Sequence, residues 1–173
     1  MNSESDRIEK INQELVEVRK DFTLLVQETA GNNWDRKIAG EVWSIKEELA
    51  HIVQALQVLP RGIKRAITGG GRSLLSFVPS RLRGWLNGHI IVPHMAKKLT
   101  HEALIEAYEK AHLELLLTLE QVSAEDWQKG TKYPQKYRTV AEMFHRPKEH
   151  FEEHASNIRS KQSVSSMRNR GQK

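Results

Sequence analysis

The stretch THEALIEAYEKAHLELLLTLEQV, residues 100–122, has the clearest helical pattern in the chain. Its apolar side chains recur every three or four residues, a spacing that places them on one face of an α-helix. They are Leu104, Tyr108, Ala111, Leu115, Leu119 and Val122. The pattern predicts a long helix with this face directed into a core.

Two further helices are predicted before this stretch. Residues 6–30 carry apolar side chains at the same spacing, and a Gly-Asn-Asn turn ends the pattern. Residues 45–67 follow Ser44, and Glu47 stands three residues after it, which is the form of a capping box. In such a box the hydroxyl and the carboxylate each bind a free backbone N–H at the helix start. Pro60 predicts a kink or an early end of this second helix.

A fourth helix is predicted after residue 139. Thr139 and Glu142 again have the form of a capping box, so the helix should start near residue 140 and continue to about residue 159. Pro147 lies inside this range and should bend the helix or unsettle a turn. The segment before it, GTKYPQKYR at residues 130–138, is expected to be a loop.

The long segment between the second and third predicted helices contains a Gly-Gly-Gly run at residues 69–71 and several further Gly and Pro residues. We expect a flexible joint followed by a crossover with one or two short helices. The chain is therefore predicted to be all-α, a four-helix bundle with a long crossover between helices 2 and 3. Residues 1–160 should form this single domain, and residues 161–173 should form a basic, disordered tail.

Composition limits the chemistry that the chain can support. The 173 residues include no cysteine, so a disulfide or a thiolate metal site is impossible and a tightly held transition metal needs imidazole and carboxylate ligands. No stretch approaches the ~18 consecutive apolar residues of a membrane span, and the charged N-terminus lacks a signal-peptide pattern. We expect a cytoplasmic protein without a transmembrane segment.

The net charge of +5 is unevenly distributed. Residues 61–101 contain eight Lys or Arg residues and no acid, and the chain after His154 adds five more without an acid. Phe77 and Trp85 lie within the first of these stretches. One hypothesis is therefore a binding module that is not an enzyme and that uses the basic crossover to hold nucleic acid or an anionic membrane surface.

The histidines suggest a different function, which is metal binding. His150 and His154 are four residues apart, so they share one face of the fourth helix, and this face also carries apolar residues. Buried imidazoles need partners, because an unsatisfied polar group in a core costs about 1–3 kcal/mol. His51 lies near the inner face of the second helix. These three side chains are candidate metal ligands, and the alternative is a metal-free bundle in which they pack or bind each other.

Several residues near these candidates could support the site. Glu48 precedes His51 by three residues on the same side and is the preferred candidate to accept the distal N–H of a ligand imidazole; the alternative explanation is a solvated helix face. His89 and His94 lie in the crossover near Trp85 and could approach the mouth of a pocket. No ligand role is expected for the remaining histidines, which are His101, His112 and His145.

Two segments resemble the motifs of the DinB-like family of metalloenzymes. WSIKEELAH, residues 43–51, is similar to the motif of its second helix, in which a Trp and a Ser or Thr precede a His. His150-x3-His154 followed by Asn157-Ile158 is similar to the motif of its last helix. The resemblance extends over nearly the whole chain. It implies a four-helix bundle, often a homodimer, with a three-histidine site for zinc, nickel or a related divalent ion at His51, His150 and His154.

The resemblance also suggests a reaction. Three imidazoles leave a coordination position open, as catalytic metal sites do. Similarity to characterised relatives favours transfer of a low-molecular-weight thiol to a small-molecule electrophile, and the basic crossover could balance the charge of an anionic thiol. Metal-assisted hydrolysis is the second enzymatic hypothesis. The sequence identifies no catalytic residue besides the candidate metal ligands.

Overall fold

The computed structural model describes residues 3–29, 34–35, 37, 41–70, 79–133 and 136–170. Four long helices account for most of them: α1 (Ser3–Thr29), α2 (Ile45–Thr68), α5 (His101–Leu119) and α6 (Val140–Arg170). The crossover contains α3 (Ser80–Leu86), the π-helical turn η2 (Asn87–Ile91) and α4 (Val92–Ala96). Two short strands, β1 (Gly130–Lys132) and β2 (Tyr137–Thr139), precede α6. The predicted all-α class is confirmed.

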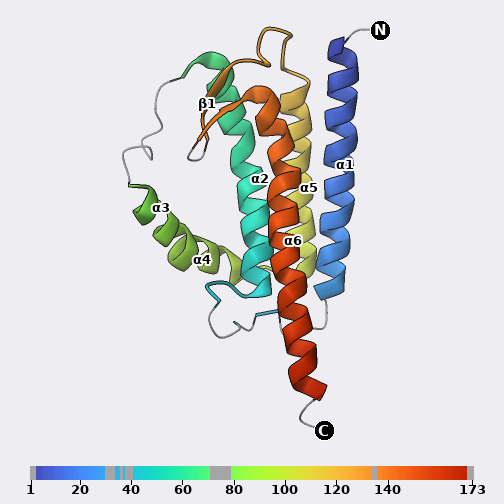
Figure 1. Cartoon of the computed structure of the whole chain (residues 1–173), viewed down its shortest axis with the longest axis vertical. Helices are drawn as coiled ribbons and strands as arrows, with labels where there is room; N and C mark the ends of the chain where they lie inside the picture. The colour runs from blue at the N-terminus through green and yellow to red at the C-terminus, as the bar shows by residue number, and fades with distance from the viewer. Residues whose placement is uncertain are drawn as a thin grey trace.

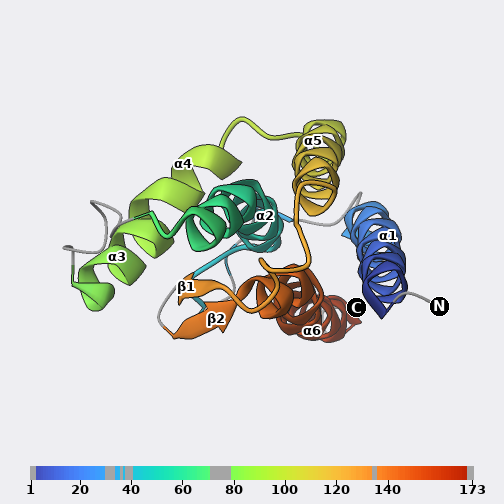
Figure 2. The same ribbon diagram turned by 90° about the horizontal axis from the view of Figure 1, so that it is seen from above.

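The long helices lie side by side (Figure 1). Both α1 and α2 pack against α5 and α6, so each long helix contacts two of the others. Seen from above, α3 and α4 lie on the side of α2 that faces away from α1, and α4 contacts α2 directly (Figure 2). None of the helices described above has a stretch apolar enough to cross a bilayer.

The core is formed by the apolar faces that the sequence pattern predicts. On α5 and just after it, all the apolar residues singled out in the stretch 100–122 are buried, and α1 contributes Phe22 and Leu25 without any exposed surface. Full burial of one such side chain is worth about 1.5–3 kcal/mol. Trp127, which follows α5, is the largest fully buried side chain and packs against Phe144 of α6.

Both predicted capping boxes are confirmed, and each fixes the start of a long helix. At α2 the backbone N–H of Ser44 donates to Glu47 Oε2 (2.7 Å), and the N–H of Glu47 donates to Ser44 Oγ (3.3 Å). At α6 the N–H of Thr139 donates to Glu142 Oε2 (2.7 Å), and the N–H of Glu142 donates to Thr139 Oγ1 (3.2 Å). Gly69 ends α2 with a φ of 63°, a conformation that favours glycine.

Helix α2 does not end early at Pro60, and α6 likewise continues through Pro147. A proline inside a helix costs ~3 kcal/mol because it removes one hydrogen bond and crowds the preceding turn. Burial of the neighbouring Leu59 and Ile63 offsets this cost in α2. The predicted range of 45–67 is confirmed, and of the two effects expected for Pro60 an early end is excluded, since packing outweighs the local preference of one residue.

Two short strands, at residues 130–132 and 137–139, are present where a loop was expected over residues 130–138. Strands β1 and β2 pair antiparallel, with Gly130 opposite Thr139 and Lys132 opposite Tyr137. A side chain at Gly130 would collide with the Arg138 carbonyl oxygen, which lies 2.5 Å from the position of an added Cβ. The two strands lack the alternating apolar pattern by which strands are recognised in a sequence, so the periodicity could not reveal them.

Helix α6 is longer than predicted and enters the segment for which a basic, disordered tail was expected. The helix passes the predicted end near residue 159 and continues to Arg170, whereas residues 171–173 lie outside the described part of the chain. No Gly or Pro interrupts the sequence between Ile158 and Gly171. Lys161, on the first turn of this extension, is buried and contacts α2, which gives the extension a tertiary anchor.

A turn after α5 gives a testable dependence of stability on pH. Asp126 accepts hydrogen bonds from Lys129 Nζ (2.7 Å), Ser123 Oγ (2.7 Å) and the Ser123 backbone N–H (3.0 Å). The hydrogen bonds from Lys129 and Ser123 lower the pKa of Asp126 from 3.8 to about 2. A carboxyl group whose pKa is lower in the folded than in the unfolded protein stabilises the fold at any pH above its unfolded-state pKa. This stabilisation is lost as the pH falls through its folded-state pKa.

We therefore expect the wild type to unfold at a higher urea concentration than Asp126→Asn above pH 4. The difference between the two midpoints should shrink steadily as the pH falls from 4 towards 2. Urea titrations of both proteins across this range check the expectation. A difference between the midpoints that stays constant down to pH 2 would show that the charge of Asp126 does not stabilise the fold.

Candidate metal centre

The structure brings together the three histidines that the sequence singles out. His51 comes from α2, and His150 and His154 come from successive turns of α6. One ring nitrogen of each lies within 4.8 Å of the others. The Nε2 atoms of His150 and His154 are 3.2 Å apart, and the His51 ring centroid is 4.9 Å from the centroids of both other rings. Contact between α2 and α6 thus builds a cluster from residues about a hundred positions apart.

The protonation states of the cluster suit metal binding. His154 is buried, and His51 and His150 are half-buried. Burial lowers the pKa of His51, and burial together with the neighbouring His154 and His51 lowers the pKa of His150 to about 3. Both rings are therefore neutral at pH 7. A neutral imidazole has a nitrogen lone pair to offer to a metal ion.

The spacing of the donor atoms fits a divalent ion. Two imidazole nitrogens bound to one tetrahedral zinc ion at the usual Zn–N bond length lie about 3.3 Å apart. The Nε2 atoms of His150 and His154 have nearly this separation. Three nitrogen donors without a thiolate suit zinc, nickel or copper better than calcium or magnesium, which prefer oxygen.

Glu48 binds the outer nitrogen of one candidate ligand. The Nδ1–H of His154 donates to Glu48 Oε2, so Nε2 is the atom of this ring that faces His150. Lys161 Nζ donates to Glu48 Oε1 (2.8 Å). Burial raises the pKa of Glu48, but the hydrogen bonds from His154 and Lys161 outweigh it and hold the pKa below its usual value. Glu48 is therefore a charged partner that orients the His154 ring.

The sequence profile of the DinB superfamily matches residues 14–158. The chain belongs to the DinB superfamily. Its fold is similar to that of a mycothiol-dependent maleylpyruvate isomerase, with a TM-score of 0.67 and 14% sequence identity. A crystal structure of a histidine-to-alanine variant of that isomerase gives the same values. The alignment covers 91% of this chain but 63% of the isomerase, so the chain spans less than two thirds of its length. No curated protein sequence matches the chain significantly.

In this DinB-superfamily chain, Glu48 lies against a candidate ligand imidazole, and the structure shows which one. Glu48 was preferred because it stands three residues before His51 on the same helix, yet it contacts His154 of α6. Side chains three residues apart on a helix run parallel to each other and point to the same neighbouring helix. Glu48 and His51 therefore both meet α6, which supplies the partner of Glu48.

Several residues of the site were missed in the sequence. Lys161 was assigned to a tail, although it continues the three-and-four spacing of His154 and Ile158. Its side chain also donates to the Trp43 backbone carbonyl (2.8 Å). The Trp43 ring lies beside the cluster, with its centroid 4.6 Å from that of His51. These residues close one side of the cluster with an aromatic ring and an ion pair.

Five other histidines lie outside the three-residue cluster. His89 and His94 are exposed, and the His89 ring stacks on Trp85 and donates its Nδ1–H to the Trp85 carbonyl (3.0 Å). Neither residue contacts the cluster among the interactions described, so their place at a pocket mouth stays a prediction. The residues expected to have no ligand role contact other partners: His145 binds Glu14, His101 stacks on Trp34, and His112 is buried beside Tyr108.

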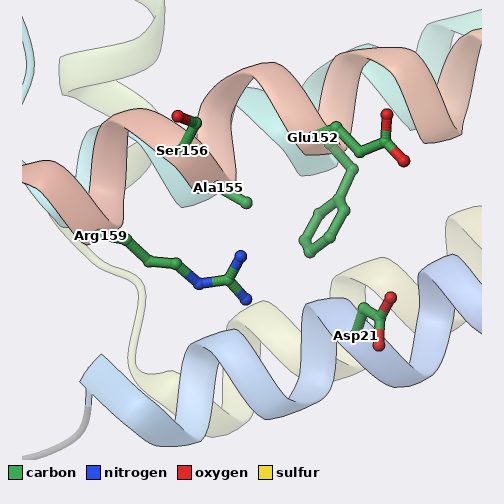
Figure 3. A pocket seen from close by; sticks show the side chains of 6 residues that line it. Asp21, Glu152, Ala155, Ser156 and Arg159 are labelled. Carbon is green, nitrogen blue, oxygen red and sulfur yellow. The ribbon is translucent and has the colours of Figure 1, made fainter.

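A shallow groove of about 400 Å³ lies between α1 and α6 (Figure 3). Asp21 of α1 faces the side chains that α6 contributes, which are Phe151, Glu152, Ala155, Ser156 and Arg159. None of the three clustered histidines lines it. The groove is therefore not assigned to the metal centre.

Proposed function

We propose that His51, His150 and His154 hold one divalent metal ion, zinc or nickel, and that the protein is a metal-dependent enzyme acting on a small molecule. The observation that carries this proposal is the convergence of three imidazoles, one of them oriented by the buried carboxylate of Glu48. Glu48 satisfies only the Nδ1–H of His154, so the ring nitrogens that face one another across the cluster stay available for a metal ion. The four long helices, read as a four-helix bundle with the crossover outside α2, supply the rigid frame that the site requires.

The roles of the individual side chains follow from their contacts. A metal ion bound by three imidazoles supplies Lewis acidity and favours the deprotonated form of a bound thiol or water. Glu48 keeps the proton on Nδ1 of His154, and Lys161 balances the charge of Glu48. Trp43 lies over His51 and His154 and keeps water from that side of the cluster. No further general acid or base is assigned.

For the reaction we propose transfer of a low-molecular-weight thiol to an electrophile. Two features support it: the family resemblance, and the fold similarity to an isomerase that depends on mycothiol, itself such a thiol. The basic residues of the crossover, among them Arg81, Lys97 and Lys98, could balance the charge of an anionic thiol. Hydrolysis by a metal-bound water is the alternative reaction at the same site.

The test is a thiol-consumption assay with zinc- and nickel-loaded protein. Mycothiol, glutathione and cysteine are each offered with a chromogenic aryl chloride, and product formation is followed by absorbance. We expect turnover that requires both metal and thiol and is lost in His150→Ala, but not in His145→Ala. Ester or amide hydrolysis without thiol would favour the alternative reaction. Neither activity from a metal-loaded protein would contradict both proposals.

A second candidate function is a binding module that uses the crossover. Leu82, Trp85 and Ile90 are each about half exposed on α3 and η2, and the stretch that contains them has basic residues without acids. Such a surface could hold an anionic membrane or nucleic acid. Binding to anionic vesicles or DNA that weakens steeply with salt, and that Trp85→Ala removes, would favour this function. Metal-dependent turnover that persists at high salt would count against it.

The family resemblance also supports a homodimer, which we include in the proposal. Leu113 and Leu117, one turn apart on α5, are exposed apolar side chains that a second copy could cover. Sedimentation velocity of the wild type and of Leu113→Ser/Leu117→Ser distinguishes a dimer from a monomer and checks this surface.

A further inference from the structure

The crossover reaches the candidate metal centre through its π-helical turn η2. Trp43, whose ring lies beside His51, donates its indole N–H to the Gly88 carbonyl of this turn (2.8 Å). Asn87, the residue before Gly88, is half-buried and directs its side-chain amide to α2. Single π-helical turns are rare in proteins, and those that occur often lie at functional sites. The turn therefore forms part of the wall around His51.

A chain of hydrogen bonds connects Asn87 with His51. Gln54 Nε2 donates to Asn87 Oδ1 (2.9 Å), and Gln54 Oε1 lies 3.2 Å from His51 Nδ1. The Nδ2 group of Asn87 lies 3.5 Å from the same ring nitrogen, at the limit of a hydrogen bond. Because this group can only donate, it makes no hydrogen bond with a protonated Nδ1, and the shorter contact with Gln54 Oε1 decides the tautomer. All three side chains are half-buried, which limits competition from water.

The direction of these bonds decides which nitrogen of His51 carries the proton. Because the NH₂ group of Gln54 is held by Asn87, the carbonyl oxygen of Gln54 must face His51. An oxygen can only accept, so Nδ1 of His51 carries the proton, and its Nε2 keeps the lone pair. Glu48 does the same for His154 with a charged carboxylate. Two ligands would thus be oriented by different outer partners, one charged and one neutral.

We propose that Gln54 and Asn87 are positioning residues, and that the π-helical turn of the crossover fixes the tautomer and the ring orientation of His51 through them. Their effect on metal affinity rests on the proposed function, whereas their effect on the tautomer does not. The crossover, whose basic character first suggested a binding surface, thereby becomes a structural component of the metal centre.

The first experiment measures zinc affinity by competition with a chromogenic chelator. Gln54→Leu and Asn87→Leu should bind zinc about 10- to 100-fold more weakly than the wild type, as is typical when an outer partner of a ligand is removed. Gln54→Glu should stay within about tenfold, because its carboxylate still accepts the Nδ1–H of His51. The matched controls are Gln57→Leu on the exposed side of α2 and Asn12→Leu on α1, both expected to resemble the wild type.

The second experiment reads the His51 tautomer in the metal-free protein by ¹⁵N NMR. Wild type, Gln54→Glu and Gln57→Leu should show His51 protonated at Nδ1, whereas Gln54→Leu should show a mixture of tautomers. Unfolding midpoints of the same proteins verify that each is folded.

The outcomes separate this inference from the proposed function. An unchanged tautomer in Gln54→Leu, or zinc affinity equal to that of Gln57→Leu, would overturn the positioning role while leaving the metal centre intact. A wild type that takes up no zinc or nickel would refute the metal centre, and the NMR comparison, extended to Asn87→Leu, would still decide whether Gln54 and Asn87 fix the His51 tautomer.

Discussion

His154→Ala is expected to lower the affinity for zinc by more than ~100-fold. Loss of an outer partner of a metal ligand already costs 10- to 100-fold, and this substitution removes a ligand together with its bond to Glu48. In the variant the buried Glu48 carboxylate loses its bond to the imidazole and keeps the one from Lys161 Nζ (2.8 Å). Competition with a chromogenic chelator at pH 7 measures the change.

His145→Ala is the matched control for this substitution. His145 also lies on α6, but its ring binds Glu14 of α1 and is not part of the cluster. We expect zinc affinity equal to that of the wild type. If His154→Ala binds zinc as tightly as the wild type does, His154 is not a metal ligand.

Lys161→Met should lower the free energy of unfolding of the metal-free protein by about 3–5 kcal/mol. The side chains of Lys161 and Glu48 are each 5% exposed, so the substitution leaves a buried carboxylate without its main cationic partner. It also removes the hydrogen bond to the Trp43 carbonyl. Urea denaturation followed by circular dichroism measures the loss.

Two comparisons make this result specific. Lys20→Met replaces an exposed lysine of α1 and should change stability by no more than about 0.5 kcal/mol. Adding Glu48→Gln to Lys161→Met removes the unpaired buried carboxylate and should recover part of the lost free energy of unfolding. If Lys161→Met behaves like Lys20→Met, Lys161 does not anchor the extension of α6.

The sequence predicted the helices well where local patterns and burial agree. The stripe from Leu104 to Val122 is buried as expected, and the capping boxes at Ser44 and Thr139 mark the starts of α2 and α6. Both signals depend on neighbours within one or two turns, which a sequence shows directly. The same locality explains why His150 and His154 could be placed on one face.

The remaining features depend on contacts between distant segments. Lys161 looked like part of a polar tail, because only its contact with Glu48 of α2 shows that it is buried. Asn87 carried no recognisable motif, because its role depends on how the crossover packs beside Gln54. The partner of Glu48 was also uncertain from spacing alone, since a helix face does not reveal what covers it.

The most direct test of the metal centre is the metal content of protein purified without an affinity tag. Elemental analysis should find about one zinc or nickel ion per chain, and His51→Ala and His150→Ala/His154→Ala should have lost it. Chelation should also lower the melting temperature of the wild type, because a ligand bound only by the folded state stabilises it. No metal in the wild type, and none taken up after incubation with zinc or nickel, would contradict the account.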